Sequence, residues 1–223
     1  NNVLLDDGDG AALIDSGHCV HAPQTVALLR RLLGTRPLRR LINTHLHSDH
    51  CGGNAALQHE WGVETHVPAG SWQAVLDWDT QALSYAATRQ HCERYRADAK
   101  LQPGQRLRIG VRDWQVLAAP GHDPESVMLF DARHGVLISA DALWENGFGL
   151  IFPELDGTDA FGDAARVLDL IESLPVRWVI PGHGAPFGDV DAALQRARSR
   201  LAGFRADPIR HLRHGAKVLL KYH

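Results

Sequence analysis

The chain has 223 residues and a formal net charge of −3, with 44% apolar and 22% charged residues, which is ordinary for a globular protein. This charge gives no overall basic field for nucleic acid or an anionic membrane, so neither is an expected partner. No stretch approaches the roughly 18 apolar residues of a membrane-spanning helix, and no signal peptide is visible.

Cysteine is sparse. The 3 cysteines, Cys19, Cys51 and Cys92, form no CxxC pair, so neither a disulfide framework nor a thiolate zinc knuckle is indicated. This usage favours a reducing compartment, and we predict a cytoplasmic location. The chain begins without methionine and stops inside a helical pattern, so we expect both ends to be trimmed or disordered.

The first half of the chain alternates short apolar runs with helical patterns. The expected elements, in order, are a hairpin of strands 2–5 and 11–14 around DDGDG, a helix at 25–33 stopped by Gly34, a strand at 38–43, a helix at 54–60 and a strand at 62–68.

Residues 70–99 differ in character. They contain no proline, and no glycine after Gly70, and they place tryptophan and tyrosine among polar residues. We predict one or two helices here, forming a helical cap insertion that selects the substrate.

The second half continues the alternation. Strands are expected at 103–110, 113–120, 127–131, 135–140 and 177–181, and helices at 161–174, at 190–204 and from the pair Asp207 and Pro208 onward. Mixed sheets with outer helices follow from this order. We predict one domain over residues 1–188 and a C-terminal helical segment over 189–223.

The stretch THLHSDHCGG, residues 44–53, is rich in metal-ligand side chains. His45 and His47 would point to one side of an extended segment, and Asp49 and His50 follow as the chain turns toward a helix. Gly52 and Gly53 would let the backbone turn tightly. This loop could serve two metal ions.

Three more candidates share one local context. His122, Asp141 and His183 each follow a hydrophobic strand, as His45 does. Strand ends at one edge of a sheet can converge on a ligand. Together with the loop they make a set of five histidines and two aspartates, which suits two zinc-like ions sharing one carboxylate.

The motifs HLHSDH, PGHDPES, ADAL and PGHG, in this order, resemble those of the metallo-β-lactamase-fold hydrolases. The resemblance implies an α+β fold, a four-layer αββα sandwich with a helical insertion and C-terminal helices. It places His45, His47 and His122 on one metal ion, Asp49, His50 and His183 on the other, and Asp141 between them. Asp15 of IDSG matches a position near the site, behind the ligands.

This ligand set implies a hydrolase that uses a metal-bound hydroxide. Two ions about 3.5–4 Å apart lower the pKa of a bridging water to roughly 7 and polarise the scissile bond. Asp49 and Asp141 are the expected catalytic residues, and Asp49 would orient the hydroxide and shuttle its proton. Zinc is the expected metal, with iron or manganese as alternatives.

The substrate is less determined. A thioester or other small ester is favoured, because a thiolate leaves without protonation. Quorum-quenching lactonases use a tyrosine shortly after the bridging aspartate, whereas this neighbourhood reads DALWENGFG, with Trp144 and no tyrosine. The alternatives are a lactonase of the acyl-homoserine-lactone type, for which Tyr85 or Tyr95 could supply the acid, and an iron-dependent redox enzyme. PGHDPES departs from the family's PGHTPGS at Asp123 and Glu125.

The partner is expected to be a small molecule, whereas its binding residues and the oligomeric state are not indicated. Cys51 is interpreted as a small buried residue. The remaining histidines without a partner pattern are interpreted as structural: His59, His66, His91 and His134.

Overall fold

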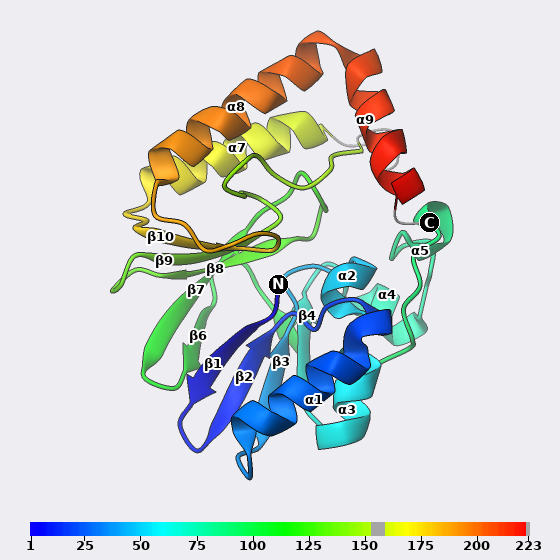
Figure 1. Cartoon of the computed structure of the whole chain (residues 1–223), viewed down its shortest axis with the longest axis vertical. Helices are drawn as coiled ribbons and strands as arrows, with labels where there is room; N and C mark the ends of the chain where they lie inside the picture. Colours follow the sequence, from blue (N-terminus) through cyan, green and yellow to red (C-terminus); the bar gives the residue numbers. More distant parts are fainter. Residues whose placement is uncertain (153–158, 222–223) are drawn as a thin grey trace. The chain divides into compact units, whose positions relative to one another are not determined.

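The computed structural model describes residues 1–152 and 159–221. The chain divides into two compact units, Asn1–Val116 (unit 1) and Leu117–His223 (unit 2), and each is described by itself (Figure 1). Residues 153–158, in the predicted domain 1–188, and residues 222–223, in the predicted C-terminal segment 189–223, lie outside the described residues. Among the described helices, none is both long enough and apolar enough to cross a membrane.

Unit 1 contains a five-stranded sheet of order β1-β2-β3-β4-β5. Its strands are β1 (Val3–Asp7), β2 (Gly10–Ile14), β3 (Leu38–Ile42), β4 (Glu64–Pro68) and β5 (Ala99–Leu101). The predicted hairpin is confirmed, since β1 and β2 pair antiparallel, with Val3 opposite Ile14 and Asp7 opposite Gly10. From β2 to β5 all pairs are parallel, so the carboxyl ends of these strands share one edge.

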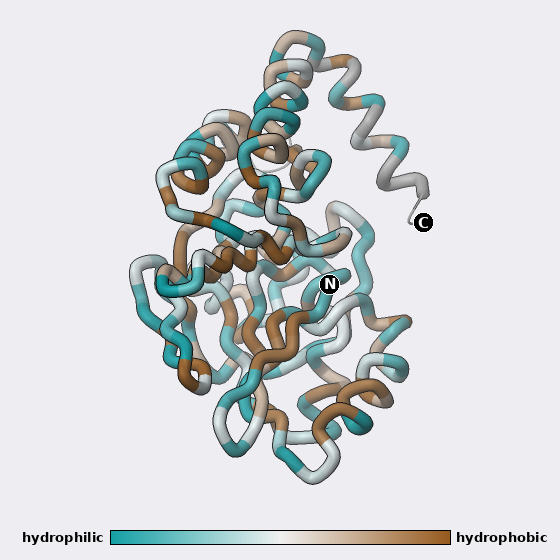
Figure 2. Tube along the Cα trace, turned by 60° about the vertical axis from the view of Figure 1, so that its left-hand side comes forward, coloured by the Kyte–Doolittle hydropathy of each residue, from teal (hydrophilic) through white to brown (hydrophobic). Residues whose placement is uncertain are grey.

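Two helices cover one face of this sheet, α1 (Ala22–Leu33) and α3 (Asn54–Trp61). They bury Leu29, Leu33 and Leu57 against Leu13 and Leu41 of the strands. Figure 2 shows hydrophobic residues concentrated along these strands. The helix α1 ends at Gly34, whose φ of 59° few residues other than glycine adopt, as the sequence predicted.

The segment 70–99 contains two helices, but both are short: α4 (Trp72–Asp77) and α5 (Tyr85–Thr88). Three residues in the left-handed region flank them, Trp78 (φ 54°), Ser84 (φ 62°) and Arg89 (φ 55°), and a right-handed helix does not continue through such a residue. The segment also ends earlier than predicted, because Ala99 is the first residue of β5, a strand that the sequence pattern did not indicate.

The second sheet has the order β10-β9-β8-β7-β6, and the division between the units falls within β7. Its strands are β6 (Arg106–Ile109), β7 (Arg112–Ala118), β8 (Val127–Asp131), β9 (Val136–Ala140) and β10 (Trp178–Pro181). β6 pairs antiparallel with β7, and β8 pairs antiparallel with β9. β10 runs parallel to β9, so the ends of these two strands also share an edge.

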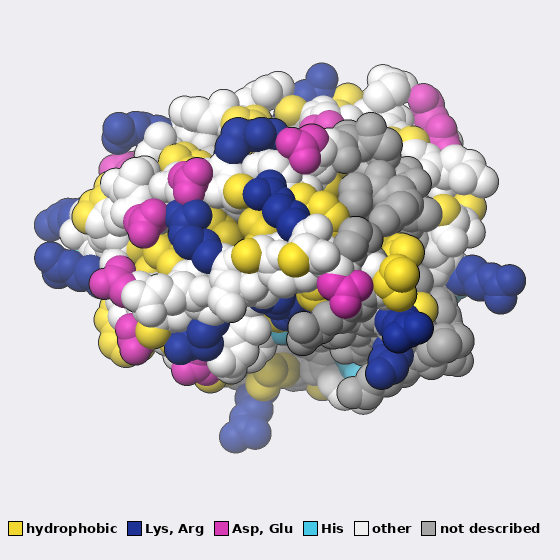
Figure 3. Space-filling model, turned by 90° about the horizontal axis from the view of Figure 1, so that it is seen from above, with side chains coloured by type: hydrophobic (Ala, Val, Ile, Leu, Met, Phe, Trp, Pro, Cys, Tyr) yellow, Lys and Arg dark blue, Asp and Glu magenta, His cyan; other side chains and the backbone are white. Residues whose placement is uncertain are grey.

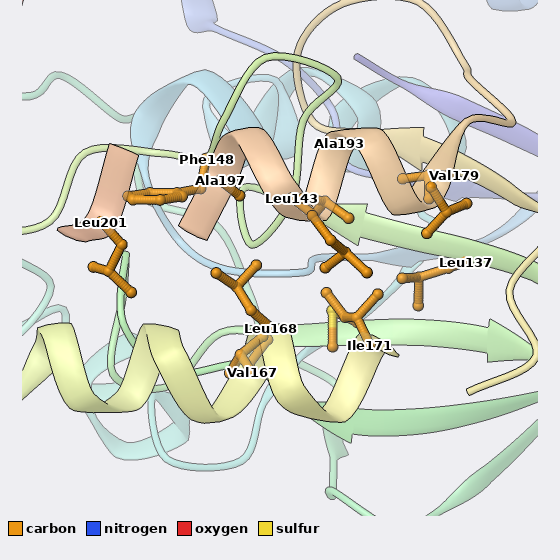
Figure 4. Packing of buried hydrophobic residues seen from close by; sticks show 14 of the residues in the cluster. Leu137, Leu143, Phe148, Val167, Leu168, Ile171, Val179, Ala193, Ala197 and Leu201 are labelled. Carbon is orange, nitrogen blue, oxygen red and sulfur yellow. The ribbon is translucent and has the colours of Figure 1, made fainter. Parts of the chain in front are cut away.

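Unit 2 also contains three long helices, α7 (Ala160–Ser173), α8 (Val190–Ala206) and α9 (Pro208–Lys221). Figure 4 shows the core between α7, α8 and the strands, where Leu168 and Ile171 of α7 and Ala193 of α8 are buried. On the outer face Arg198 of α8 lies 2.7 Å from both Asp169 and Glu172 of α7, and Figure 3 shows basic and acidic side chains interspersed there. A helix opens at Pro208, as predicted.

Candidate metal centre

The histidine-rich loop begins where β3 ends, beside the end of β2. After β3 the chain runs through Thr44 to His47 and then forms the single helical turn α2 (Ser48–Cys51). The two glycines that follow, predicted to let the backbone turn tightly, have ordinary negative φ angles, −62° at Gly52 and −84° at Gly53. They are needed for close approach, since a Cβ would lie 2.3 Å from the Ser48 carbonyl oxygen at position 52 and 2.6 Å from that of Ser16 at position 53.

The loop gathers the four predicted ligands of unit 1. The ring centroid of His45 lies 4.8 Å from that of His47 and 4.1 Å from that of His50. Asp49 Oδ2 lies 3.9 Å from His50 Nε2, with the His50 side chain fully buried and that of Asp49 46% exposed. Imidazole nitrogens and carboxylate oxygens are donor types that divalent cations such as zinc bind.

Asp15 holds this loop from behind. Its Oδ1 accepts from the Thr44 amide at 2.8 Å, and its Oδ2 accepts from the Thr44 hydroxyl at 2.7 Å and from His50 Nδ1 at 2.8 Å. The residue is 3% exposed and has a φ of 59°. The hydrogen bond to Asp15 places the proton of the neutral His50 ring on Nδ1. Nε2 is therefore the nitrogen that can bind a metal ion.

The segment 70–99 supports the same loop from another side. Gln90 Oε1 accepts from the Ser48 amide at 2.6 Å, at the start of α2, and the Tyr85 hydroxyl donates to the Leu46 carbonyl at 2.8 Å. Cys51 Sγ lies 3.1 Å from that hydroxyl, and burial raises the pKa of this thiol well above its ordinary value. Cys51 is therefore a buried thiol and not a nucleophile.

The three predicted ligands of unit 2 also lie together, at the ends of β7, β9 and β10. Asp141 follows β9 and His183 follows the parallel strand β10. Asp141 Oδ2 lies 3.3 Å from His122 Nε2 and 3.6 Å from His183 Nε2. Two imidazole nitrogens thus approach the same oxygen of one carboxylate, and these are again donor types that zinc-like cations bind.

The segment 149–151 fixes the ring of His122. His122 Nδ1 bonds the Leu150 carbonyl, which directs Nε2 toward Asp141. Gly149 packs directly on the ring, since a Cβ at this position would lie 2.6 Å from His122 Nδ1. From α9, the buried His211 bonds the next carbonyl, that of Ile151, at 2.6 Å.

Trp144 reaches the other oxygen of Asp141. Its indole Nε1 donates to Asp141 Oδ1 at 3.2 Å, and its ring meets that of His183 edge-on, with 5.1 Å between centroids. At the positions that depart from the family motif, Asp123 Oδ1 accepts the amide of Glu125 at 2.8 Å.

The histidines interpreted as structural lie elsewhere. His59 and His91 are exposed, His66 on β4 lies 3.0 Å from Glu64, and His134 bonds Asp131 in the turn after β8. Sequence reasoning did not identify the supporting residues Gln90, His211 and Gly149, nor the contact of Trp144 with Asp141.

A sequence profile of the Metallo-beta-lactamase superfamily matches residues 1–183, and the chain therefore belongs to this family. Among curated relatives, the acyl-coenzyme A thioesterase MBLAC2 of Gallus gallus is 29% identical over 70% of this chain. The hydroxyacylglutathione hydrolase of Anaeromyxobacter dehalogenans is 31% identical over 66% of it. The chain spans 59% of the first relative and 47% of the second.

Solved structures show the same fold. The FEZ-1 metallo-beta-lactamase of Legionella gormanii superposes with a TM-score of 0.73 at 17% identity, covering 94% of this chain and 89% of that one. TTHA1623 in a di-iron-bound form gives a TM-score of 0.65 at 25% identity, covering 88% of this chain and 93% of that one. The predicted family and fold class are confirmed.

Proposed function

We propose that the chain is a metal-dependent hydrolase with a dinuclear centre, acting on a thioester. The observation that carries the proposal is the approach of His122 Nε2 and His183 Nε2 to the same oxygen of Asp141, at 3.3 and 3.6 Å. A carboxylate oxygen that two imidazole nitrogens approach would suit a ligand that acts together with both histidines in holding metal ions. The di-iron form of TTHA1623 supports a site for two ions.

The family resemblance supports a common centre for both ligand clusters. One ion would be held by His45, His47 and His122, and the other by Asp49, His50 and His183, with Asp141 shared. When bound, such ions supply Lewis acidity and lower the pKa of a water molecule to roughly 7. Asp49 would orient that water and accept its proton, a role that suits its partly exposed carboxylate.

A thioester is favoured over a lactone because the leaving thiolate needs no proton donor. Of the tyrosines in the described residues, Tyr85 donates its hydroxyl to the Leu46 carbonyl, and burial raises the pKa of both Tyr85 and Tyr95. The indole N–H of Trp144 is bonded to Asp141. Both curated relatives reported above are named for thioester substrates, acyl-coenzyme A and hydroxyacylglutathione.

The test is a substrate panel with metal analysis. Purified protein is assayed on acyl-coenzyme A, lactoylglutathione and acyl-homoserine lactone, before and after chelation. We expect thioester hydrolysis that is lost on chelation and restored by zinc, with about two ions per chain. Preferred lactone hydrolysis would contradict the substrate class, and one iron with oxygen consumption would support the redox alternative.

The matched variant is Asp141→Ala. Removing a shared ligand should lower kcat more than about 100-fold, beyond the 10–100-fold effect of groups that only support ligands. The control variant is Asp131→Ala, at a buried aspartate of β8 that bonds His134 and is not a predicted metal ligand. Full activity in Asp141→Ala would contradict the dinuclear mechanism.

The cap function of residues 70–99 and the division of the chain at residues 188 and 189 also remain proposals. The contacts of Tyr85 and Gln90 with the loop mean that deleting the segment would remove supports of the ligands. Substitution of the exposed Gln81, with substrate preference as the readout, tests the cap without disturbing these contacts.

A further inference from the structure

The turn that carries Trp144 is held in place by α8. The Trp144 amide donates to the Gly147 carbonyl at 2.6 Å, and Arg196 Nε donates to the Glu145 carbonyl at 2.7 Å. Gly147 has a φ of 127°, and a Cβ there would lie 2.6 Å from Arg200 Nη1. The backbone of the turn that carries the indole is therefore held by its own hydrogen bond and by side chains of α8.

The two carboxylate oxygens of Asp141 have different partners. Oδ1 accepts the Trp144 Nε1 hydrogen at 3.2 Å, whereas Oδ2 faces His122 Nε2 and His183 Nε2. The edge-on contact of the indole with the His183 ring, at 5.1 Å, restrains a second ligand. One side chain thus touches two of the three predicted ligands of unit 2.

We propose that Trp144 is the positioning residue of the bridging carboxylate, and this proposal rests on the proposed function. By holding Oδ1, the indole N–H restrains rotation of the Asp141 carboxylate and leaves Oδ2, the oxygen that faces both imidazoles, as the one that would serve as ligand. An indole has no titration near neutral pH, so this donor would act at every working pH. Groups that orient ligands typically change metal affinity or activity by about 10–100-fold.

The experiment compares Trp144→Phe with Trp178→Phe, a control at a tryptophan of β10 whose side chain is exposed. Each metal-free protein is titrated with cobalt, and the stoichiometry, the visible spectrum and the thermal unfolding temperature of the metal-free protein are recorded. We expect the second cobalt ion to bind about tenfold more weakly to Trp144→Phe, with a changed spectrum and a lower kcat. Trp178→Phe should match the wild type.

A second variant separates the hydrogen bond from packing. Benzothienylalanine at position 144 keeps the shape of the ring but replaces N–H by sulfur, and the same loss of cobalt affinity is expected. If both position-144 variants bind two cobalt ions as tightly as wild type, Trp144 does not position the carboxylate. Wild-type protein that binds no cobalt contradicts the proposed function itself, and this proposal with it, so the two failures are distinguishable.

Discussion

At the scale of single residues, the orientation of two candidate histidine ligands depends on the group that hydrogen-bonds the ring nitrogen Nδ1. His50 Nδ1 bonds the carboxylate of Asp15, whereas His122 Nδ1 bonds the backbone carbonyl of Leu150. Both choices leave Nε2 for a metal. Only the first can be removed by a conservative substitution, because a backbone carbonyl persists in every variant.

Asp15→Asn should lower both the affinity for zinc and the free energy of unfolding. The amide that replaces Asp15 Oδ2 cannot accept from both the Thr44 hydroxyl and His50 Nδ1, while asparagine tolerates the φ of 59° at this position. We expect a loss of about 1–3 kcal/mol in the free energy of unfolding and about 10–100-fold in zinc affinity. Chelator competition and urea unfolding measure both.

The control for this substitution is Asp9→Asn, at a carboxylate whose side chain is 80% exposed. It should change neither quantity. Unaltered zinc affinity in Asp15→Asn would show that the orientation of His50 does not depend on Asp15.

At the level of elements, the irregular segment between α4 and β5 is a support for α2. Tyr85 and Tyr95 are both buried, at 4% and 5% exposure, but differ in their hydroxyl groups. Tyr85 donates to Leu46, while the Tyr95 hydroxyl has no hydrogen-bond partner of good geometry among the described residues. The two phenylalanine variants therefore form a matched pair.

Tyr85→Phe should destabilise the protein by about 1–2 kcal/mol, because the Leu46 carbonyl loses a donor in a buried setting. Tyr95→Phe should be neutral or slightly stabilising, since it removes a buried polar group that lacks a partner. Chemical unfolding of both variants checks the difference. Equal destabilisation would mean that the Tyr85 hydrogen bond contributes nothing specific.

Asp7 joins three strands of unit 1 and gives a prediction on pH. It bonds Arg40 of β3 at 2.7 Å and the Gly110 amide after β6 at 2.8 Å. Burial raises the pKa of Asp7, but the hydrogen bonds from Arg40 and Gly110 together with the positive charges of Arg40 and Arg39 outweigh burial, and the pKa lies below its ordinary value of 3.8. A carboxyl with a lowered pKa in the folded state stabilises the protein above that ordinary value.

The stability advantage of wild type over Asp7→Asn should therefore be full at about pH 6 and should vanish as the pH falls below 3.8, through the folded pKa. Urea unfolding of both proteins at several pH values measures this difference. A difference that grew toward acid would contradict the assignment of the charged form to the folded state.

For the whole molecule, the predicted ligands are shared out between the two units, with His45, His47, Asp49 and His50 in unit 1 and His122, Asp141 and His183 in unit 2. If both sets bind the same ions, bound metal should raise the free energy of unfolding of both units together. Zinc at a free concentration 100 times its Kd should add about 2.7 kcal/mol to the free energy of unfolding.

His45→Ala and His122→Ala should each reduce this zinc-dependent stabilisation, and His59→Ala, at an exposed histidine, should preserve it. Calorimetric unfolding with and without chelator gives the measurement. A variant of either unit that kept the full zinc effect would indicate separate centres.

The sequence predicted the features that local pattern encodes. Apolar runs located β2, β3, β4, β7, β9 and β10, although not the parallel strand β5, and the predicted ligands that come after these strands lie together within each unit. The hydrogen bonds that support the ligand loops could not be predicted, because they join residues far apart in the sequence. Gln90 and Ser48 are 42 positions apart, and His211 and Ile151 are 60 positions apart. The left-handed residues Trp78 and Arg89, which limit α4 and α5, carry no glycine signal.

Gly149 has an evolutionary consequence. Any side chain at this position would overlap the ring of His122, so position 149 cannot gain a side chain while His122 is kept in place. Among homologues, a substitution of the equivalent glycine should occur only where the equivalent histidine has also been replaced. Position 149 would then serve as a marker in genome sequences, separating members that retain this ligand from those that have abandoned it for another use of the fold.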